Sequence, residues 1–248
     1  KLGLVKYDWW SECLHGVARA GKATVFPKPI GLGATWDSDL VKRIADAISD
    51  EARAKHQREV EQNGFSDRHF GLTFFSPTLN IARDPRWGRT SECFSEDPLL
   101  TSDMGVAFIK GMQGDDPYYL KTVATAKHFV ANNEENRRLG GSAEVDEISL
   151  REYYFPAFQA AVTQGRVTSI MGAYNALNGT PCCANSFLLN DVLRNEWGFD
   201  GVVISDGSAI DKLYTHHKYA PSLEKGAAMA LKAGCDMSLR DEYRKGLY

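Results

Sequence analysis

Short apolar, β-branched runs alternate along the chain with longer segments in which apolar positions recur at helical spacing. Most of the short runs lack strict alternation of apolar and polar positions, which is typical of strands that are covered on both faces. Seven runs are predicted as strands: residues 3–7, 23–26, 72–76, 122–128, 168–174, 202–205 and 236–239.

The segments between these runs predict helices. The clearest has an apolar stripe that includes Val41, Ile44 and Ile48. Asp37 is its predicted N-cap, and Gly64 is expected to end it. Three further helices are predicted: one from Ser149 to near Gly165, one from Asn185 or Ser186 through Leu193, and one over 223–233.

Strand, helix and strand follow one another without a linker rich in Pro, Gly or Ser, so we expect parallel strands joined by right-handed crossovers. The whole chain, residues 1–248, is predicted to be a single α/β domain. Seven strands favour a TIM-type (β/α)8 barrel over a doubly wound sheet, because Gly31-Leu-Gly33 lacks the third glycine of a dinucleotide-binding turn. An eighth strand is not visible, so we expect the chain to begin or end inside a larger protein.

Composition narrows the functional classes. The 248 residues are 43% hydrophobic and 25% charged, which is enough for a globular core. The net charge of −3 leaves no basic excess for nucleic acid, and no run reaches the roughly 18 apolar residues of a membrane helix. The five cysteines form no C-x-x-C pair and there is no H-E-x-x-H motif, so neither a metal nor another cofactor is expected.

Polar side chains gather where predicted strands end. In parallel barrels the loops that follow the strands converge on one face, so these side chains are expected to line one cleft. A mixture of carboxylate, imidazole, phenol, ammonium and guanidinium groups suits a neutral polyhydroxyl ligand. The residues are Asp206, His128, Tyr174, Lys127 and, on the longer loop after 72–76, Arg89.

Each of these residues also has a purely structural explanation. Asp206 could be the N-cap of the next helix, His128 a hydrogen-bonded core histidine, and Tyr174 a packing residue. Two loops also allow a structural interpretation: Arg83, Arg86 and Arg89 could form an ion-pair cluster around Asp84, and residues 134–138 could be a solvated loop.

Several longer motifs occur in one order along the chain, and together they resemble glycoside hydrolase family 3, in particular its two-domain β-glucosidase and β-xylosidase branch. The motifs are Trp9-Trp-Ser-Glu-Cys-Leu-His-Gly-Val-Ala18, Arg83-Asp-Pro-Arg-Trp-Gly-Arg89, Lys127-His-Phe129, Met171-Gly-Ala-Tyr-Asn175 and Trp197-Gly-Phe-Asp-Gly-Val-Val-Ile-Ser-Asp206.

The resemblance implies a retaining exo-β-glycosidase that acts on terminal β-linked sugars of small oligosaccharides or on aryl glycosides. It implies that Asp206 is the catalytic nucleophile, which attacks the anomeric carbon. The longer Glu12, where many glucosidases have Asp, would crowd a hexose hydroxymethyl group and so favours xylose. The substrate-binding residues that it implies are Glu12, Arg89, Lys127, His128, Tyr174 and Met171.

The chain departs from the family pattern in two respects. Gly207 stands where the family often has Trp or Cys, which removes a wall of the leaving-group site. The family also has a longer N-terminal segment and a second, C-terminal domain, which usually supplies the general acid/base. Glu134 and Glu135 lie on a suitable loop but match no acid/base motif. The family suggests a periplasmic or secreted location.

We expect Asp206 to stay ionised because the charges of Lys127 and Arg89 favour its anion. Two alternatives remain open at this point. One is a Schiff-base aldolase that uses the amine of Lys127, and the other is a barrel that binds sugar without turnover.

Overall fold

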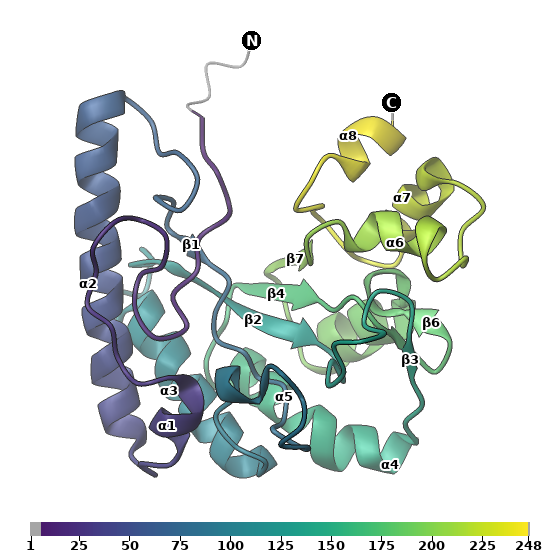
Figure 1. Cartoon of the computed structure of the whole chain (residues 1–248), viewed down its shortest axis with the longest axis horizontal. Helices are drawn as coiled ribbons and strands as arrows, with labels where there is room; N and C mark the ends of the chain where they lie inside the picture. The colour runs from purple at the N-terminus through teal and green to yellow at the C-terminus, as the bar shows by residue number, and fades with distance from the viewer. Residues whose placement is uncertain (1–5, 248) are drawn as a thin grey trace.

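The structure is a computed structural model that describes residues 6–247 (Figure 1). Its main sheet has four parallel strands in the order β1-β2-β4-β7, so the α/β prediction with parallel strands is confirmed. A small second sheet has the order β3-β5-β6. The strands are β1 (Thr73–Phe74), β2 (Val123–Phe129), β3 (Ser142–Ala143), β4 (Ser169–Gly172), β5 (Ala176–Leu177), β6 (Thr180–Pro181) and β7 (Val202–Ser205).

The register brings the carboxyl ends of three strands level with one another. Phe129 of β2 pairs with Gly172 of β4, and Gly172 pairs with Ser205 of β7. The backbone N–H of Asp206 still donates to the carbonyl of Gly172, at 3.1 Å. The residues that end or follow these strands therefore emerge at one edge of the sheet.

Helices α2, α3 and α5 follow one another side by side, and α3 and α5 contact β2 of the sheet (Figure 1). The helices α6, α7 and α8 follow β7 and form a group of their own. The α-helices are α1 (Pro29–Gly33), α2 (Ser38–Asn63), α3 (Pro98–Gln113), α4 (Glu147–Ser149), α5 (Pro156–Thr163), α6 (Ala209–Thr215), α7 (Leu223–Lys232) and α8 (Glu242–Gly246). The 3₁₀ turns are Thr90–Glu92 and Cys182–Ala184, and the π-helical segments are Leu150–Tyr154 and Phe187–Glu196.

The longest helix, α2, forms as the sequence predicts. The Asp37 carboxylate accepts the N–H of Leu40 at 2.8 Å, which satisfies one of the free donors of the first turn. Gly64 ends the helix with a φ of 76°, a conformation that is unstrained only for glycine. The predicted helix over 223–233 is also confirmed, as α7.

Helix α3 was not predicted from the sequence. Asp97 caps it and Pro98 begins it, but 10 of its 16 residues are buried, so the polar face around Asp103 and Lys110 is too narrow to give a clear amphipathic pattern. Its close contact with α2 explains this burial.

Several predicted elements differ from the structure. Residues 23–26 are irregular rather than a strand, residues 3–5 lie outside the described part, and Tyr7 is in no strand. Of 236–239, only Met237 pairs, through a parallel bridge to Ile204 at the edge of the sheet. The helix expected from Ser149 begins at Glu147, because Asp146 rather than Ser149 accepts the capping hydrogen bond. The helix expected from Asn185 or Ser186 is a π-helical segment.

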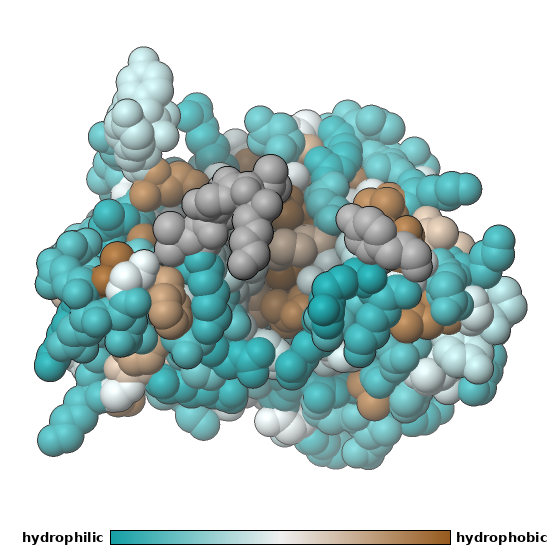
Figure 2. All heavy atoms as spheres, turned by 90° about the horizontal axis from the view of Figure 1, so that it is seen from above, coloured by the Kyte–Doolittle hydropathy of each residue, from teal (hydrophilic) through white to brown (hydrophobic). Residues whose placement is uncertain are grey.

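The two faces of the main sheet pack differently. One face joins the large core under the helices. The other holds a small apolar cluster of Phe75, Met171 and Ile204, against which Trp10 and Leu239 pack. Figure 2, viewed from above, shows hydrophobic residues in a central hollow with a mainly hydrophilic rim. Among residues 6–247, no helix combines the length and hydropathy needed to cross a membrane.

Candidate active site

Asp206 lies directly after β7 at the edge of the sheet where the strand ends converge. Its side chain is 16% exposed, so it opens on the surface rather than into the packed interior. Oδ1 accepts the backbone N–H of Gly207 at 2.6 Å, and Oδ2 lies 3.7 Å from Nε2 of His128. Ser208, not Asp206, occupies the N-cap of α6, and its side chain makes no cap hydrogen bond, so the capping explanation for Asp206 does not hold.

Asn80 determines which ring nitrogen of His128 bears the hydrogen. Its Oδ1 accepts the backbone N–H of His128 at 2.9 Å and its Nδ2 donates to the carbonyl of His128 at 2.9 Å, which fixes the orientation of the amide. The Nδ1 of His128, 3.1 Å from the same Oδ1, must therefore be the donor. Nε2 is left as an acceptor and receives a hydrogen bond from Nη2 of Arg89 at 3.2 Å.

The imidazole of His128 is neutral. Burial is the main cause that lowers its pKa well below the usual 6.5, and the charges of Arg89 and Lys127 lower it further. The approach of His128 to Asp206 is therefore not a salt bridge at neutral pH. It presents a lone pair, not a proton, toward the carboxylate.

Arg89 is held in place by Glu92. Nε and Nη2 of Arg89 each donate to one carboxylate oxygen of Glu92, both at 2.8 Å, in a bidentate pair. Burial lowers the pKa of Arg89, but the hydrogen bonds and charge of Glu92 outweigh it and the pKa is raised. Glu135 adds a second carboxylate 4.0 Å from Nη1. The guanidinium is thus a fixed cation beside His128.

Lys127 is 6% exposed, and burial lowers its pKa. The charge of Arg89 lowers it further, while the carboxylates of Glu12, Glu92 and Asp206 act in the opposite direction. Glu12 accepts the indole N–H of Trp10 at 3.0 Å. Lys127 is therefore a buried amine that is influenced by both a cation and several carboxylates.

Tyr174 forms a wall beside Asp206. Its hydroxyl donates to the carbonyl of Gly207 at 2.5 Å, and the guanidinium of Arg138 lies 5.0 Å from its ring centroid. Burial raises the pKa of Tyr174, as does the charge of Asp206. The phenol therefore stays protonated as a hydrogen-bond donor.

The pKa of Asp206 is shifted in the direction opposite to the one expected from Lys127 and Arg89. Burial raises it, and the N–H of Gly207 and the charges of Lys127 and Arg89, which lower it, do not fully compensate. The two cations do favour the anion as expected, but desolvation is the larger effect.

Two residues of the loop 134–138 join the site, so that loop is not simply solvated. Arg138 pairs with Glu135 at 3.1 Å. Glu135 faces Arg89, and Arg138 faces the ring of Tyr174.

The ion-pair cluster suggested around Asp84 includes Arg86, at 2.7 Å, whereas Arg83 hydrogen-bonds to the hydroxyl of Tyr154 instead. The contribution of Glu92 was missed, although its spacing of three residues from Arg89 within one helical turn was a usable signal.

Met171 lies apart from this polar network. It is 2% exposed and packs against Phe75 and Ile204, so its contact with a substrate stays a prediction. Within residues 6–247, no group of three or more His, Cys, Asp or Glu side chains is arranged to hold a metal ion.

Comparisons with known proteins give one consistent result. The model of the glycosyl hydrolase family 3 N-terminal domain matches residues 5–248. A xylan 1,4-β-xylosidase of Xylanibacter ruminicola is 39% identical over 100% of this chain and 30% of its own length. β-D-Xylosidase 3 of Arabidopsis thaliana is 38% identical over 96% of this chain and 32% of its own length.

Solved structures agree with this result. A GH3 exo-β-xylosidase in complex with a xylobiose aziridine activity-based probe superposes with a TM-score of 0.90 and 35% identity, over 99% of this chain and 33% of that one. A β-glucosidase from Listeria innocua gives a TM-score of 0.79 and 33% identity, over 94% of this chain and 30% of that one. These matches confirm the predicted barrel class. The chain spans about a third of the length of the relatives that it matches.

Proposed function

The chain belongs to glycosyl hydrolase family 3, and on that premise we propose that it contributes the nucleophile of a retaining exo-β-glycosidase. The proposed substrates are terminal β-linked xylose or glucose units of small oligosaccharides. The observation that supports this most directly is the placement of Asp206. Its carboxylate directly follows β7, is partly exposed, accepts the N–H of Gly207 and lies near the cations Lys127 and Arg89.

In this proposal an oxygen of Asp206 attacks C1 of the bound sugar and the bond from C1 to the aglycone oxygen breaks. The departing oxygen takes a proton from a general acid, and water then cleaves the glycosyl-aspartate ester. Arg89, Lys127 and the Nδ1-protonated His128 bind sugar hydroxyls or orient groups that do. Because positive charge develops at the sugar ring in the transition state, we place the cations at the hydroxyls rather than at the ring oxygen.

Xylose is favoured over glucose as the terminal sugar. Relatives named as xylosidases are 38–41% identical to the chain. Trp10 holds Oε1 of Glu12, and Oε2 lies 3.6 Å from Arg19, so the longer carboxylate occupies a defined position in the site. We propose that this position leaves less room for a hydroxymethyl group than an aspartate would.

In this proposal the part of the site that holds the leaving group lies near Gly207. A Cβ at this position would lie 3.4 Å from the Tyr174 hydroxyl and 3.8 Å from Trp10, in ordinary contact. The opening between these two aromatic residues is thus wider than it would be with a larger residue at 207.

We also propose that residues 1–248 belong to one barrel unit and that the general acid comes from residues outside it. The nearby carboxylates Glu92 and Glu135 are both paired with arginines. For Glu92 the hydrogen bonds and charge of Arg89 outweigh burial and lower the pKa, which favours the ionised form that cannot donate a proton.

Trapping of the covalent intermediate tests the role of Asp206. We expect 2,4-dinitrophenyl 2-deoxy-2-fluoro-β-xyloside to add one fluoroxylosyl group per chain, with peptide mapping placing it on Asp206. Asp206→Asn should not be labelled, whereas Asp200→Asn, a change of the same kind at an exposed position, should be labelled like the wild type.

The alternatives give different results. Reversible binding without labelling would support a sugar-binding barrel. Trapping of a carbonyl compound on Lys127 by borohydride would support the aldolase. Labelling of a carboxylate other than Asp206 would refute the assignment of the nucleophile.

A further inference from the structure

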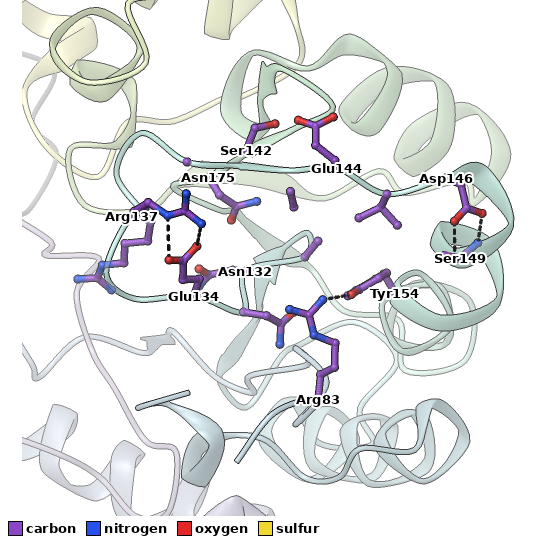
Figure 3. Close-up of a pocket in the computed structure, with 16 residues that line it drawn as sticks. Arg83, Asn132, Glu134, Arg137, Ser142, Glu144, Asp146, Ser149, Tyr154 and Asn175 are labelled. Carbon is purple, nitrogen blue, oxygen red and sulfur yellow. Dashed lines mark hydrogen bonds and ion pairs between the residues drawn. The ribbon is translucent and has the colours of Figure 1, made fainter. Parts of the chain in front are cut away.

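A polar cavity lies beside the candidate active site. Its volume is about 360 Å³, within the range of about 300–1,000 Å³ that is typical of small-molecule sites. Figure 3 shows it enclosed by the loop after β2, the segment from β3 to α4, and Arg83 and Tyr154.

Asn132 lines this cavity with an amide that has no partner. The residue is 1% exposed, and among the described residues neither its Oδ1 nor its Nδ2 makes a hydrogen bond. Asn175, 6% exposed, also lines the cavity, and its Oδ1 lacks a partner although its Nδ2 donates to the carbonyls of Val130 and Ala176. Buried amides of this kind normally have partners, so donors and acceptors from a bound molecule are expected here.

The charges that line the cavity balance one another. Three arginines and three carboxylates contribute to the lining. Glu134 pairs with Arg137 at 3.0 Å, and Asp146 accepts the N–H of Ser149 at 2.9 Å. Without a net charge, the lining favours a neutral ligand. Amide groups that both donate and accept suit hydroxyl groups, which do the same.

The cavity borders the nucleophile. Arg138 lines the cavity and also lies over the ring of Tyr174, 5.0 Å from its centroid. Asn175 directly follows Tyr174, whose hydroxyl binds the carbonyl of Gly207 next to Asp206. The segment Tyr174-Asn175 therefore contacts both the cavity and the surroundings of Asp206.

We propose that this cavity is a second sugar-binding site, which holds one neutral pyranose unit with its hydroxyls on the amides of Asn132 and Asn175. That the unit is xylose or glucose rests on the proposed function, whereas its neutral, hydroxyl-rich character rests on the cavity alone. The unit is either a free monosaccharide or part of an oligosaccharide.

The test follows the side-chain amide NMR signals of Asn132 while xylose or xylotriose is added to protein whose Asp206 is occupied by the fluoroxylosyl group. We expect saturable shifts of the Asn132 signals. If xylose produces them, the site takes free monosaccharide. The same titration is repeated on Asp206→Asn protein, whose Asp206 site is empty. If only xylotriose shifts the signals, and only in this variant, the bound unit belongs to an oligosaccharide that extends from the Asp206 site.

Asn132→Leu is expected to weaken this binding about ten-fold, because two hydrogen bonds to neutral groups are lost. It should not lower the melting temperature, because it removes a buried amide that has no partner. The matched control is Asn136→Leu on the exposed part of the same loop, which should bind normally. If Asn132→Leu does not fold, Ala143→Trp serves instead by filling the cavity.

Absence of any sugar-induced shift, or unchanged affinity in both cavity variants, would overturn the proposal and leave water as the occupant. Failure of the proposed function looks different. Asp206 would then resist labelling, while sugar would still shift the Asn132 signals of the untreated protein.

Discussion

Burial makes Asp206 a weaker acid than an exposed aspartate, since its raised pKa reflects a carboxylate partly removed from water. The attack on the sugar that we propose for Asp206 needs the ionised carboxylate, which is the form that burial disfavours. At neutral pH the folded protein therefore loses stability through the desolvation of this carboxylate, whereas the unfolded chain leaves the carboxylate in water. The proposed function of Asp206 and the stability of the fold are therefore opposed at this residue.

We predict that Asp206→Asn stabilises the fold at neutral pH by about 0.5–2 kcal/mol, the usual size of such gains. Because the pKa of Asp206 is higher in the folded state, this loss of stability is absent below the pKa of the unfolded aspartate. It appears as the pH rises through the folded value. The advantage of the variant should accordingly shrink on acidification. Urea unfolding at several pH values measures this.

Asp200→Asn is the control for this prediction, because Asp200 is exposed and its replacement should change stability little at any pH. The rate of labelling of wild-type protein should fall on acidification at a higher pH than an ordinary aspartate would give. A stability difference for Asp206→Asn that grows as the pH falls would contradict the direction of the pKa shift.

At the scale of elements, the contact between α2 and α3 depends on Gly111. A Cβ at this position would overlap the carbonyl oxygen of Lys42 and lie 2.7 Å from the Cβ of Ala45. The two helix backbones can therefore approach closely only because residue 111 has no side chain.

We predict that Gly111→Ala destabilises the protein by roughly 1–3 kcal/mol, because overpacking outweighs the better helix propensity of alanine. Gly31→Ala in α1 is the matched control. Its Cβ would meet only Pro27, at 3.6 Å, so stability should stay the same or rise slightly. Thermal unfolding of both variants measures the difference, and equal melting temperatures would refute the close-packing argument.

The elements that the sequence predicted well are those with a local signal. Helix α2 has a cap, a stripe and a terminal glycine, and β2, β4 and β7 are apolar runs that lead into polar residues. Helix α3 has a cap at Asp97 and a terminal glycine at Gly114, but its apolar stripe is weak because its neighbours bury it on most sides. Residues 23–26 have strand-like composition but no partner strand, which no local pattern reveals.

The site residues that lie at the ends of strands could be predicted from the sequence. The register places Lys127, His128, Tyr174 and Asp206 together, as the strand-end argument expected. Glu135 and Arg138 were not assigned, because their contribution depends on how their loop folds over the sheet, whereas Glu92 was missed despite its three-residue spacing from Arg89. The balance of burial against charge at Asp206 likewise requires three-dimensional distances.

At the scale of the whole molecule, the described residues include the proposed nucleophile, Asp206, but no second carboxyl group with the properties of a matching acid. A general acid needs a carboxyl group whose pKa is raised, so that it holds a proton at neutral pH. Within residues 6–247, Glu92 has a lowered pKa: burial raises it, but the hydrogen bonds and charge of Arg89 outweigh burial. Glu135 pairs with Arg138 at 3.1 Å, and Glu12 lies 3.6 Å from Arg19.

We therefore predict that the 248-residue chain depends strongly on leaving-group quality. It should hydrolyse 2,4-dinitrophenyl β-xyloside on the order of a hundred-fold or more faster than phenyl β-xyloside, because general acid catalysis contributes about 10²–10⁴-fold and matters only for poor leaving groups. Xylobiose should be cleaved extremely slowly. Steady-state rates on the three substrates measure this, with the full-length Arabidopsis relative assayed alongside for comparison. If the chain cleaved xylobiose and the dinitrophenyl xyloside at similar rates, a carboxyl group within it would have to act as the acid, and Glu135, whose Oε1 is buried without a hydrogen bond, would be the first to replace.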